Sequence, residues 1–158
     1  MKNIFKLMAL FAFVLCFASC DDDEKVEIPA LPVTAANLNG TWQLSEWNGQ
    51  ALAEGTYCYI TFNRRELTFE MYQKFDSMYA RYITGSFYIE NDPYLGYVIS
   101  GEYDFGNGDW NNDYIVTDLL ESGSMIWTVK DDDSDVNKYV RCEKVPESII
   151  EEAKTNKN

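Results

Sequence analysis

Acidic and amide side chains alternate in two stretches of the chain, in a pattern that could bind Ca2+. The first stretch is Asp131 to Asp135, and the second runs from Asn107 to Asp113. A Ca2+-binding loop supplies oxygen ligands at alternate positions, but it also needs Gly at its sixth position and Glu at its twelfth. In the first stretch those positions hold Val136 and Cys142, and in the second the sixth holds Asn112. Polar loops therefore explain both stretches better, and we expect no metal site.

The chain contains no histidine, which removes many catalytic arrangements. Histidine is the commonest general base, and it completes serine and cysteine nucleophile systems and many zinc sites. Paired carboxylates could still hydrolyse glycosides, because such pairs form in space and Asp and Glu are abundant. The candidates in strand-like segments, which could face a barrel interior, are Glu46, Glu70, Glu102 and Asp118. Abundance alone is a poor signal, so we expect a protein without catalysis and without a cofactor.

Two of the four cysteines, Cys58 and Cys142, lie in strand-like alternations with apolar neighbours. Outside the cytoplasm such a pair can form a disulfide, provided that the two Cα atoms come within about 7 Å of each other. Buried free cysteine is equally ordinary. Strand adjacency decides between the two, and the sequence leaves both open.

The N-terminal residues have the composition of an export signal. Lys2 and Lys6 precede an apolar run from Leu7 to Phe17, and Ala18-Ser19 then leads to Cys20. The apolar run is shorter than the roughly 20 residues of a membrane-spanning helix. A Cys after two small residues resembles the lipobox of bacterial lipoproteins, although Phe17 stands where Leu is usual. The resemblance implies acylation of the Cys20 thiol and a signal peptide over residues 1–19; the alternative is an ordinary secretory signal with an incidental Cys.

An acidic run, Asp21 to Glu24, follows Cys20 directly. It resembles the export tag of surface lipoproteins in some Gram-negative bacteria, and the alternative is a solvated linker. The resemblance implies a lipid anchor in the outer membrane, at the cell surface or otherwise at the periplasmic face. Pro29 and Pro32 favour an extended path, so we expect a tether over residues 20–37.

The balance of charge limits the partners. The chain has 26 acidic and 13 basic side chains, and its net charge is −13. Binding to phosphate backbones or anionic lipid surfaces requires clustered Lys and Arg, so we expect no nucleic acid partner. The length suits one domain with a core of its own.

From Leu38 onward the chain consists of short alternating runs separated by turn residues such as Asn48-Gly49 and Ser122-Gly123. No proline falls inside a run, as strand pairing requires. Gly85 and Gly101 fall inside runs, where they predict bulges or bends. The eight predicted strands are 41–48, 56–63, 66–74, 79–90, 96–105, 113–119, 124–130 and 137–144.

These consecutive strands predict an all-β fold, an eight-stranded up-and-down antiparallel barrel, because closure removes the exposed edges of such a sheet. A barrel of this size is filled by side chains or holds one small ligand. Pro146 and the Glu residues after it predict a short helix within residues 146–158, ending in a frayed tail.

Gly40-Thr41-Trp42 opens the first strand and Arg141 lies in the last. This pattern resembles the lipocalins, in which a G-x-W motif begins the barrel and a late Arg packs on the Trp. Segments such as Lys138 to Glu143 are similar to the lipocalin-like domains of bacterial surface lipoproteins. The resemblance covers about residues 38–145. It implies that Trp42 and Arg141 close the base of the barrel, and that the barrel binds a small molecule.

Alternation along the strands places one set of large apolar side chains inside the barrel. They are expected either to pack a solid core or to line a ligand cavity, and the candidate ligand-binding residues are Trp42, Phe62, Phe69, Met71, Phe87, Tyr103 and Trp127. Our first hypothesis is a membrane-anchored barrel that binds a small apolar, amphipathic or sugar ligand. The alternative is a structural or interaction lipoprotein whose filled barrel docks or inhibits another envelope protein.

Overall fold

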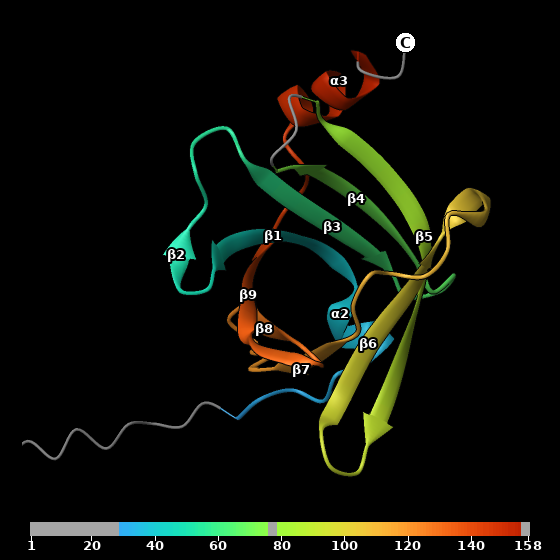
Figure 1. Ribbon diagram of the computed structural model, residues 1–158, viewed down its shortest axis with the longest axis vertical. Helices are drawn as coiled ribbons and strands as arrows, with labels where there is room; N and C mark the ends of the chain where they lie inside the picture. Colours follow the sequence, from blue (N-terminus) through green and yellow to red (C-terminus); the bar gives the residue numbers. More distant parts are fainter. Residues whose placement is uncertain (1–28, 76–78, 156–158) are drawn as a thin grey trace, which may run out of the picture.

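The computed structural model describes residues 29–75 and 79–155. It is dominated by one antiparallel sheet that closes on itself, because β1 pairs with both β3 and β9 (Figure 1). The strands are β1 (Gly40–Trp47), β2 (Gln50–Ala51), β3 (Tyr57–Asn63), β4 (Thr68–Lys74), β5 (Arg81–Asp92), β6 (Gly96–Tyr103), β7 (Tyr114–Thr117), β8 (Ser124–Val129) and β9 (Asp132–Cys142). All of them except β2 form the ring, in sequence order. The prediction of an eight-stranded up-and-down barrel is confirmed.

The largest departures from the predicted strands are at β2 and β9. The short strand β2 pairs with the end of β1 and was not predicted. Strand β9 begins at Asp132, whereas the sequence predicted a turn as far as Asp135. Asp132 pairs with Val129 directly across the turn, and a register shift beside Val129 accommodates the tight reversal. The Asp132 carboxylate accepts hydrogen bonds from the backbone and the hydroxyl of Ser134, so this acidic stretch stabilises its own turn.

The last residues of the expected tether belong to the folded domain. The Leu31 backbone N–H donates to the Leu119 carbonyl at 2.7 Å, and Val33 is buried. Thr34 then caps the short helix α2 (Ala35–Leu38), whose Leu38 is fully buried. Apolar side chains thus hold this segment against one end of the barrel, despite its two prolines. Cys20, the acidic run and the predicted signal peptide lie outside the described residues.

Trp42 and Arg141 meet at that same end of the barrel. The Trp42 ring is fully buried, and its Nε1 donates to the Leu38 carbonyl at 2.8 Å. The Arg141 guanidinium lies over the ring, 4.2 Å from its centroid, and donates to the carbonyls of Asn37 and Asn39. A Cβ at Gly40 would come within 2.8 Å of the guanidinium, and the φ of this residue is +112°. Glycine is therefore needed at the first position of the G-x-W pattern. We call this the closed end.

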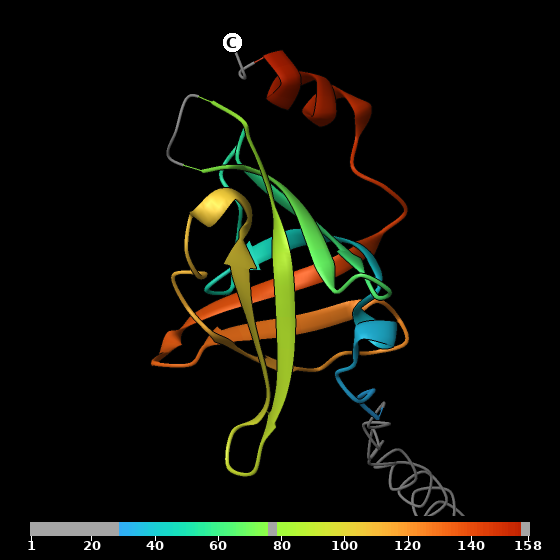
Figure 2. The same cartoon turned by 90° about the vertical axis from the view of Figure 1, so that its right-hand side faces the viewer.

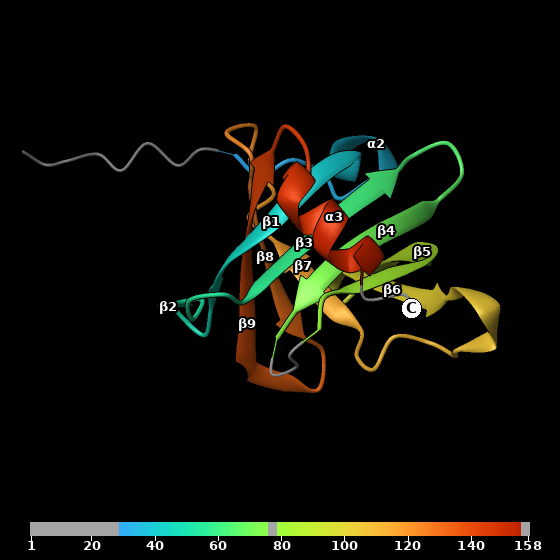
Figure 3. The same cartoon turned by 90° about the horizontal axis from the view of Figure 1, so that it is seen from above.

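The other end of the barrel carries the remaining helices. The single-turn helix η1 (Asp104–Gly106) follows β6, and α3 (Glu147–Thr155) lies beside the ends of β4 and β5. Figure 2 shows α2 and η1 on opposite sides of the barrel and α3 above the strands, and Figure 3 looks down onto α3. The predicted C-terminal helix is therefore present and packs on the domain. In the described part of the chain, no helix has the length and apolar character that a membrane span needs.

Candidate ligand-binding site

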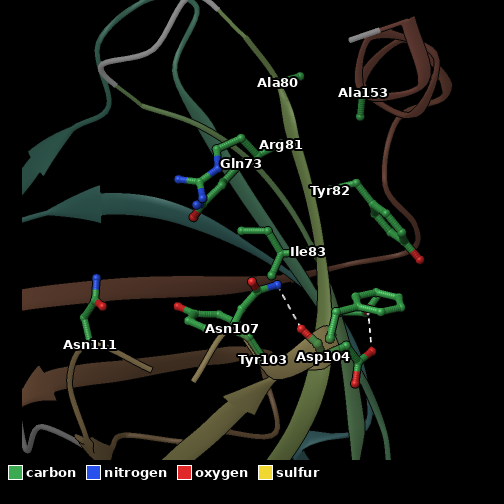
Figure 4. A pocket seen from close by; sticks show the side chains of 12 residues that line it. Gln73, Ala80, Arg81, Tyr82, Ile83, Tyr103, Asp104, Asn107, Asn111 and Ala153 are labelled. Carbon is green, nitrogen blue, oxygen red and sulfur yellow. Dashed lines mark hydrogen bonds between the residues drawn. The ribbon is translucent and has the colours of Figure 1, made fainter. Parts of the chain in front are cut away.

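A hollow of about 900 Å3 opens at the end of the barrel opposite Trp42, which we call the mouth. Four side chains on three neighbouring strands line its inner wall: Gln73 from β4, Arg81 and Ile83 from β5, and Tyr103 from β6 (Figure 4). The loop after β6 adds Asn107 and Asn111. Polar side chains therefore make up much of the lining, and Ile83 and the Tyr103 ring are part of its apolar share.

Strand register explains why these side chains share a wall. Gln73 is the pairing partner of Arg81, and Tyr103 is the partner of Gly85. Residues two apart on a strand point to the same face, so Arg81, Ile83 and Gly85 form one inward row. In β4 the corresponding row runs from buried Phe69 through Met71 to Gln73. The barrel interior therefore becomes more polar toward the mouth.

The hollow continues over the edge of β5 onto the outside of the barrel. There Tyr82 and Thr84, on the outer face of β5, line it together with Ala153 of α3, which is itself buried. Figure 4 shows Tyr82 and Ala153 on the opposite side of β5 from Gln73 and Asn111. Helix α3 thus forms part of the rim.

Helix α3 is fixed to the mouth by one carboxylate. Glu152 accepts from Lys74 Nζ at 2.6 Å and from the Tyr57 hydroxyl at 3.0 Å. These two hydrogen bonds lower the pKa of Glu152, the bond from Lys74 having the larger effect. Burial, with the Glu152 charge as a further cause, raises the pKa of Tyr57 to about 12. The phenol therefore remains protonated and donates to Glu152 at any neutral pH.

Arg81 brings a positive charge to the rim of the hollow. Its side chain is exposed, and within the described residues no carboxylate lies close enough to pair with it. Its electrostatic influence reaches Tyr103: burial raises the pKa of that phenol, and the charge of Arg81 opposes the rise. The neighbouring Asp104 accepts instead from the Thr84 hydroxyl.

Below the hollow, a thiol and a phenol are buried together. Both side chains are buried, and burial raises the pKa of both, that of Cys58 to about 12. A thiol with so high a pKa stays protonated at neutral pH and is a poor nucleophile.

The two cysteines do not form a disulfide. Cys58 and Cys142 are both free thiols. Cys58 is buried in the interior, whereas Cys142 is paired with Thr41 on β1, on the same outward face as Thr61. The two side chains thus point to opposite faces of the barrel wall. Of the two possibilities that the sequence left open, the free thiols are observed.

The loop between β6 and β7 inserts Trp110 into the barrel. The Trp110 backbone N–H donates to the Gly101 carbonyl at 2.7 Å, and its ring lies 5.1 Å from that of Phe69. A Cβ at Gly101 would come within 2.3 Å of the Trp110 ring, and one at Gly85 would strike Phe69. The register of β5 with β6 is continuous at both glycines, so the predicted bulges are absent there. The glycines make room for aromatic rings instead.

Trp110 also leaves one polar atom without a partner. Its side chain is 9% exposed, and among the described residues no acceptor bonds to the buried Nε1. The residues on either side of it in the loop, Asn107 and Asn111, line the hollow. Sequence reasoning did not select Trp110; the signal it offered was a lone aromatic residue within a polar loop.

The predicted ligand-binding residues occupy different depths of the barrel. Most of them are buried in the packed core between the closed end and the middle: Trp42, Phe62, Phe69, Phe87 and Trp127. Rings in this group touch directly, as with Phe62 and Phe87 at 4.9 Å. Met71 and Tyr103 are half-buried nearer the mouth, and Tyr103 lines the hollow.

The carboxylates that were considered for hydrolysis do not converge. Glu46 binds Lys138 at 2.8 Å, and Glu70, Glu102 and Asp118 are exposed. Nowhere in residues 29–75 and 79–155 do three acidic or cysteine side chains gather as metal ligands would.

Comparison with known proteins gives one match. A family model described as a lipocalin-like domain matches residues 38–127, which is more than half of the chain and extends from the end of α2 into β8. No curated protein and no solved structure matches the chain.

Proposed function

Because this chain belongs to the lipocalin-like domain family, we propose that it binds a small molecule at the mouth of its barrel. One observation carries the proposal: the hollow of about 900 Å3 with side chains from β4, β5 and β6 on its inner wall. The packed core below it gives the mouth a rigid floor, which reduces the entropy lost when a ligand binds.

The lining favours an amphipathic ligand. Ile83 and the Tyr103 ring offer apolar contact, while Gln73 and Asn107 offer hydrogen-bonding groups. A purely apolar molecule would leave these polar groups without water or a partner, which costs free energy. A sugar could stack on Tyr103 and bind the amides, so it is a second candidate of the same polarity.

We propose binding without catalysis. The thiol nearest the hollow is held protonated, and the acidic side chains that we considered point away from the interior or are already paired. Without histidine, the chain has no side chain with an ordinary pKa near neutrality.

The proposed location is the outer membrane, through acyl chains on Cys20, with the cell surface favoured by the acidic run that follows. Two or three acyl chains contribute enough buried CH2 groups for stable anchoring, at about 0.8 kcal/mol each. Cys20→Ala should move the protein from the membrane fraction to the soluble fraction and abolish labelling by a radioactive fatty acid. Membrane retention of an unlabelled Cys20→Ala protein would overturn the lipid anchor.

Native mass spectrometry of the protein purified gently from its own host tests the binding function. We expect a reproducible extra mass that is lost on denaturation. Ile83→Arg places a large side chain in the hollow and should remove the extra mass, whereas Tyr88→Arg, on the outer face of the same strand, should retain it. An extra mass that survives Ile83→Arg would locate the ligand elsewhere.

The filled lower half of the barrel favours a second candidate, an interaction protein that docks or inhibits another envelope protein. Trp42, Phe62 and Phe87 are almost fully buried in that half. A bare mass in the experiment above would favour this candidate, and crosslinking on intact cells would then identify the partner.

A further inference from the structure

We propose that the ligand at the mouth carries an anionic group, which binds the guanidinium of Arg81. This inference rests on the proposed function, because it names the chemical class of the molecule that would occupy the same hollow. The shared chemistry is an anionic head, such as a carboxylate, sulfate or phosphate monoester, on an apolar body.

The first support is the charge of Arg81, a cation on the wall of the hollow in a strongly acidic protein. The chain has twice as many acidic as basic side chains, yet Arg81 has no ion-pair partner among the described residues. The lysines of the domain behave differently, since Lys74, Lys130 and Lys138 each bind a carboxylate across strands or elements. A cation left unpaired on the wall of a hollow is available for a ligand anion.

Two acidic groups near the mouth already accept hydrogen bonds from other donors. Asp104 accepts from the Thr84 hydroxyl. Asp135 accepts from Trp47 Nε1 at 2.8 Å and from the side chain of Asn137 at 3.1 Å. Their charges are therefore partly satisfied, and neither pairs with Arg81.

The second support is a surplus of donors around Arg81. The guanidinium can donate two parallel hydrogen bonds to one oxyanion, and its cross-strand neighbour Gln73 adds an amide. Unpaired donors on the protein call for acceptor oxygens on the ligand, and an anion supplies the strongest ones.

The apolar part of the ligand has a defined place. Ile83 follows Arg81 on the inward row of β5, and Tyr103 lies across from the same row on β6. An anion held at Arg81 would thus direct an attached hydrocarbon down the wall toward Met71 and Phe69. This geometry selects amphipathic anions over inorganic ones, because only the former also bury the apolar surface below the rim.

Two fluorescent probes of similar shape test the inference: anilinonaphthalene sulfonate, which is anionic, and N-phenylnaphthylamine, which is neutral. The full chain is used with Cys20→Ala, so that detergent is not needed. We expect both probes to bind to the protein. Arg81→Gln should lower the affinity for the anionic probe by about 10-fold and leave the affinity for the neutral probe unchanged. Arg81→Lys should retain part of the affinity for the anionic probe. The control, Arg65→Gln, removes one positive charge at the closed end and should change the affinity for neither probe.

Competition then tests the ligand class. Dodecanoate and dodecyl phosphate should displace the anionic probe from the protein that retains Arg81, and dodecanol should displace it less well. If Arg81→Gln leaves the affinity for every anion unchanged, the anionic ligand is refuted while binding at the mouth stands. If neither probe binds and Ile83→Arg changes nothing, the proposed function itself is overturned.

Discussion

The guanidinium of Arg141 lies 4.2 Å from the centroid of the Trp42 ring, and it donates to two carbonyls that flank the end of α2. One side chain of β9 thereby joins the first strand to the segment that precedes it. The lipocalin resemblance predicted contact between these residues, and the structure adds why Gly40 precedes them: its position leaves no room for a Cβ beside the guanidinium.

Trp42→Ala should lower the free energy of unfolding by about 3–5 kcal/mol, because it leaves a cavity in the packed closed end and removes the ring that Arg141 covers. Urea unfolding followed by circular dichroism measures this. Trp47→Ala is the matched control: its ring is 45% exposed, and we expect a loss of about 1 kcal/mol, from its hydrogen bond to Asp135. A loss below about 1 kcal/mol for Trp42→Ala would contradict its role in closing the barrel.

Gly101→Ala should destabilise the domain by about 1–3 kcal/mol, because the new Cβ would displace the Trp110 ring. We expect the displaced indole to shift the tryptophan emission to longer wavelength. The double variant with Gly101→Ala and Trp110→Ala tests this cause. If the Cβ acts by displacing the indole, Trp110→Ala should lower the free energy of unfolding less in the Gly101→Ala background than in the unmodified protein. Additive losses would show that Gly101 and Trp110 act independently, and Ser100→Ala on the same strand should be nearly silent.

The two thiols should react at very different rates. Cys58 is buried and its pKa is raised to about 12, so at pH 8 it should resist iodoacetamide until the protein unfolds. Cys142 is partly exposed on the outer face and should react in the folded state, although burial raises its pKa too. Peptide mapping by mass spectrometry separates the two sites. Equal modification of both in the folded protein would contradict the observed packing.

The attachment of α3 should weaken in acid. The folded-state pKa of Glu152 is lowered, so its contribution is present above the ordinary glutamate pKa of about 4.3 and is lost as the pH falls through the lowered value. Amide hydrogen exchange in α3, corrected for intrinsic rates, should therefore accelerate below about pH 4 relative to the barrel strands. Glu152→Gln should show the faster exchange already at neutral pH.

The control for this experiment lies on the same helix. Glu147 pairs with Lys144 in an ion pair that is mostly exposed, so Glu147→Gln should leave exchange in α3 nearly unchanged. Equal effects of the two substitutions would mean that the helix responds to its own charge and not to the contact with Lys74 and Tyr57.

The barrel strands could be predicted because their signal is local. Ile60 and Phe62 alternate with polar neighbours, and turn residues such as Asn48-Gly49 separate one run from the next. Closure followed from the number of consecutive strands, and the Trp42–Arg141 contact followed from a family pattern. The prediction of the fold thus depended on patterns within a few residues and on the order of motifs along the chain.

The mouth could not be predicted in the same way, because it depends on register between strands. Arg81 lies near the start of a predicted strand, where the sequence indicates only a solvent-exposed charge. Its pairing with Gln73 in the structure shows that its side chain lies on the inward face. Trp110 lies in a loop of Asn, Gly and Asp, where nothing in the sequence indicates insertion above Gly101. When contacts with residues far away in the chain bury or orient a side chain, its position produces no periodic pattern in the sequence.

The chain enters the barrel at the closed end, where the Leu31 backbone N–H donates to the Leu119 carbonyl, and the hollow opens at the opposite end. The placement of the N-terminal segment and the hollow at opposite ends matters if the protein is held by its N-terminus. If the proposed acyl anchor on Cys20 holds the chain at a bilayer, the Trp42 base would lie nearer to that bilayer, and Arg81 would face the surrounding fluid. Molecules from that fluid would reach the rim directly, whereas lipids of the supporting membrane would first have to leave it and pass around the barrel.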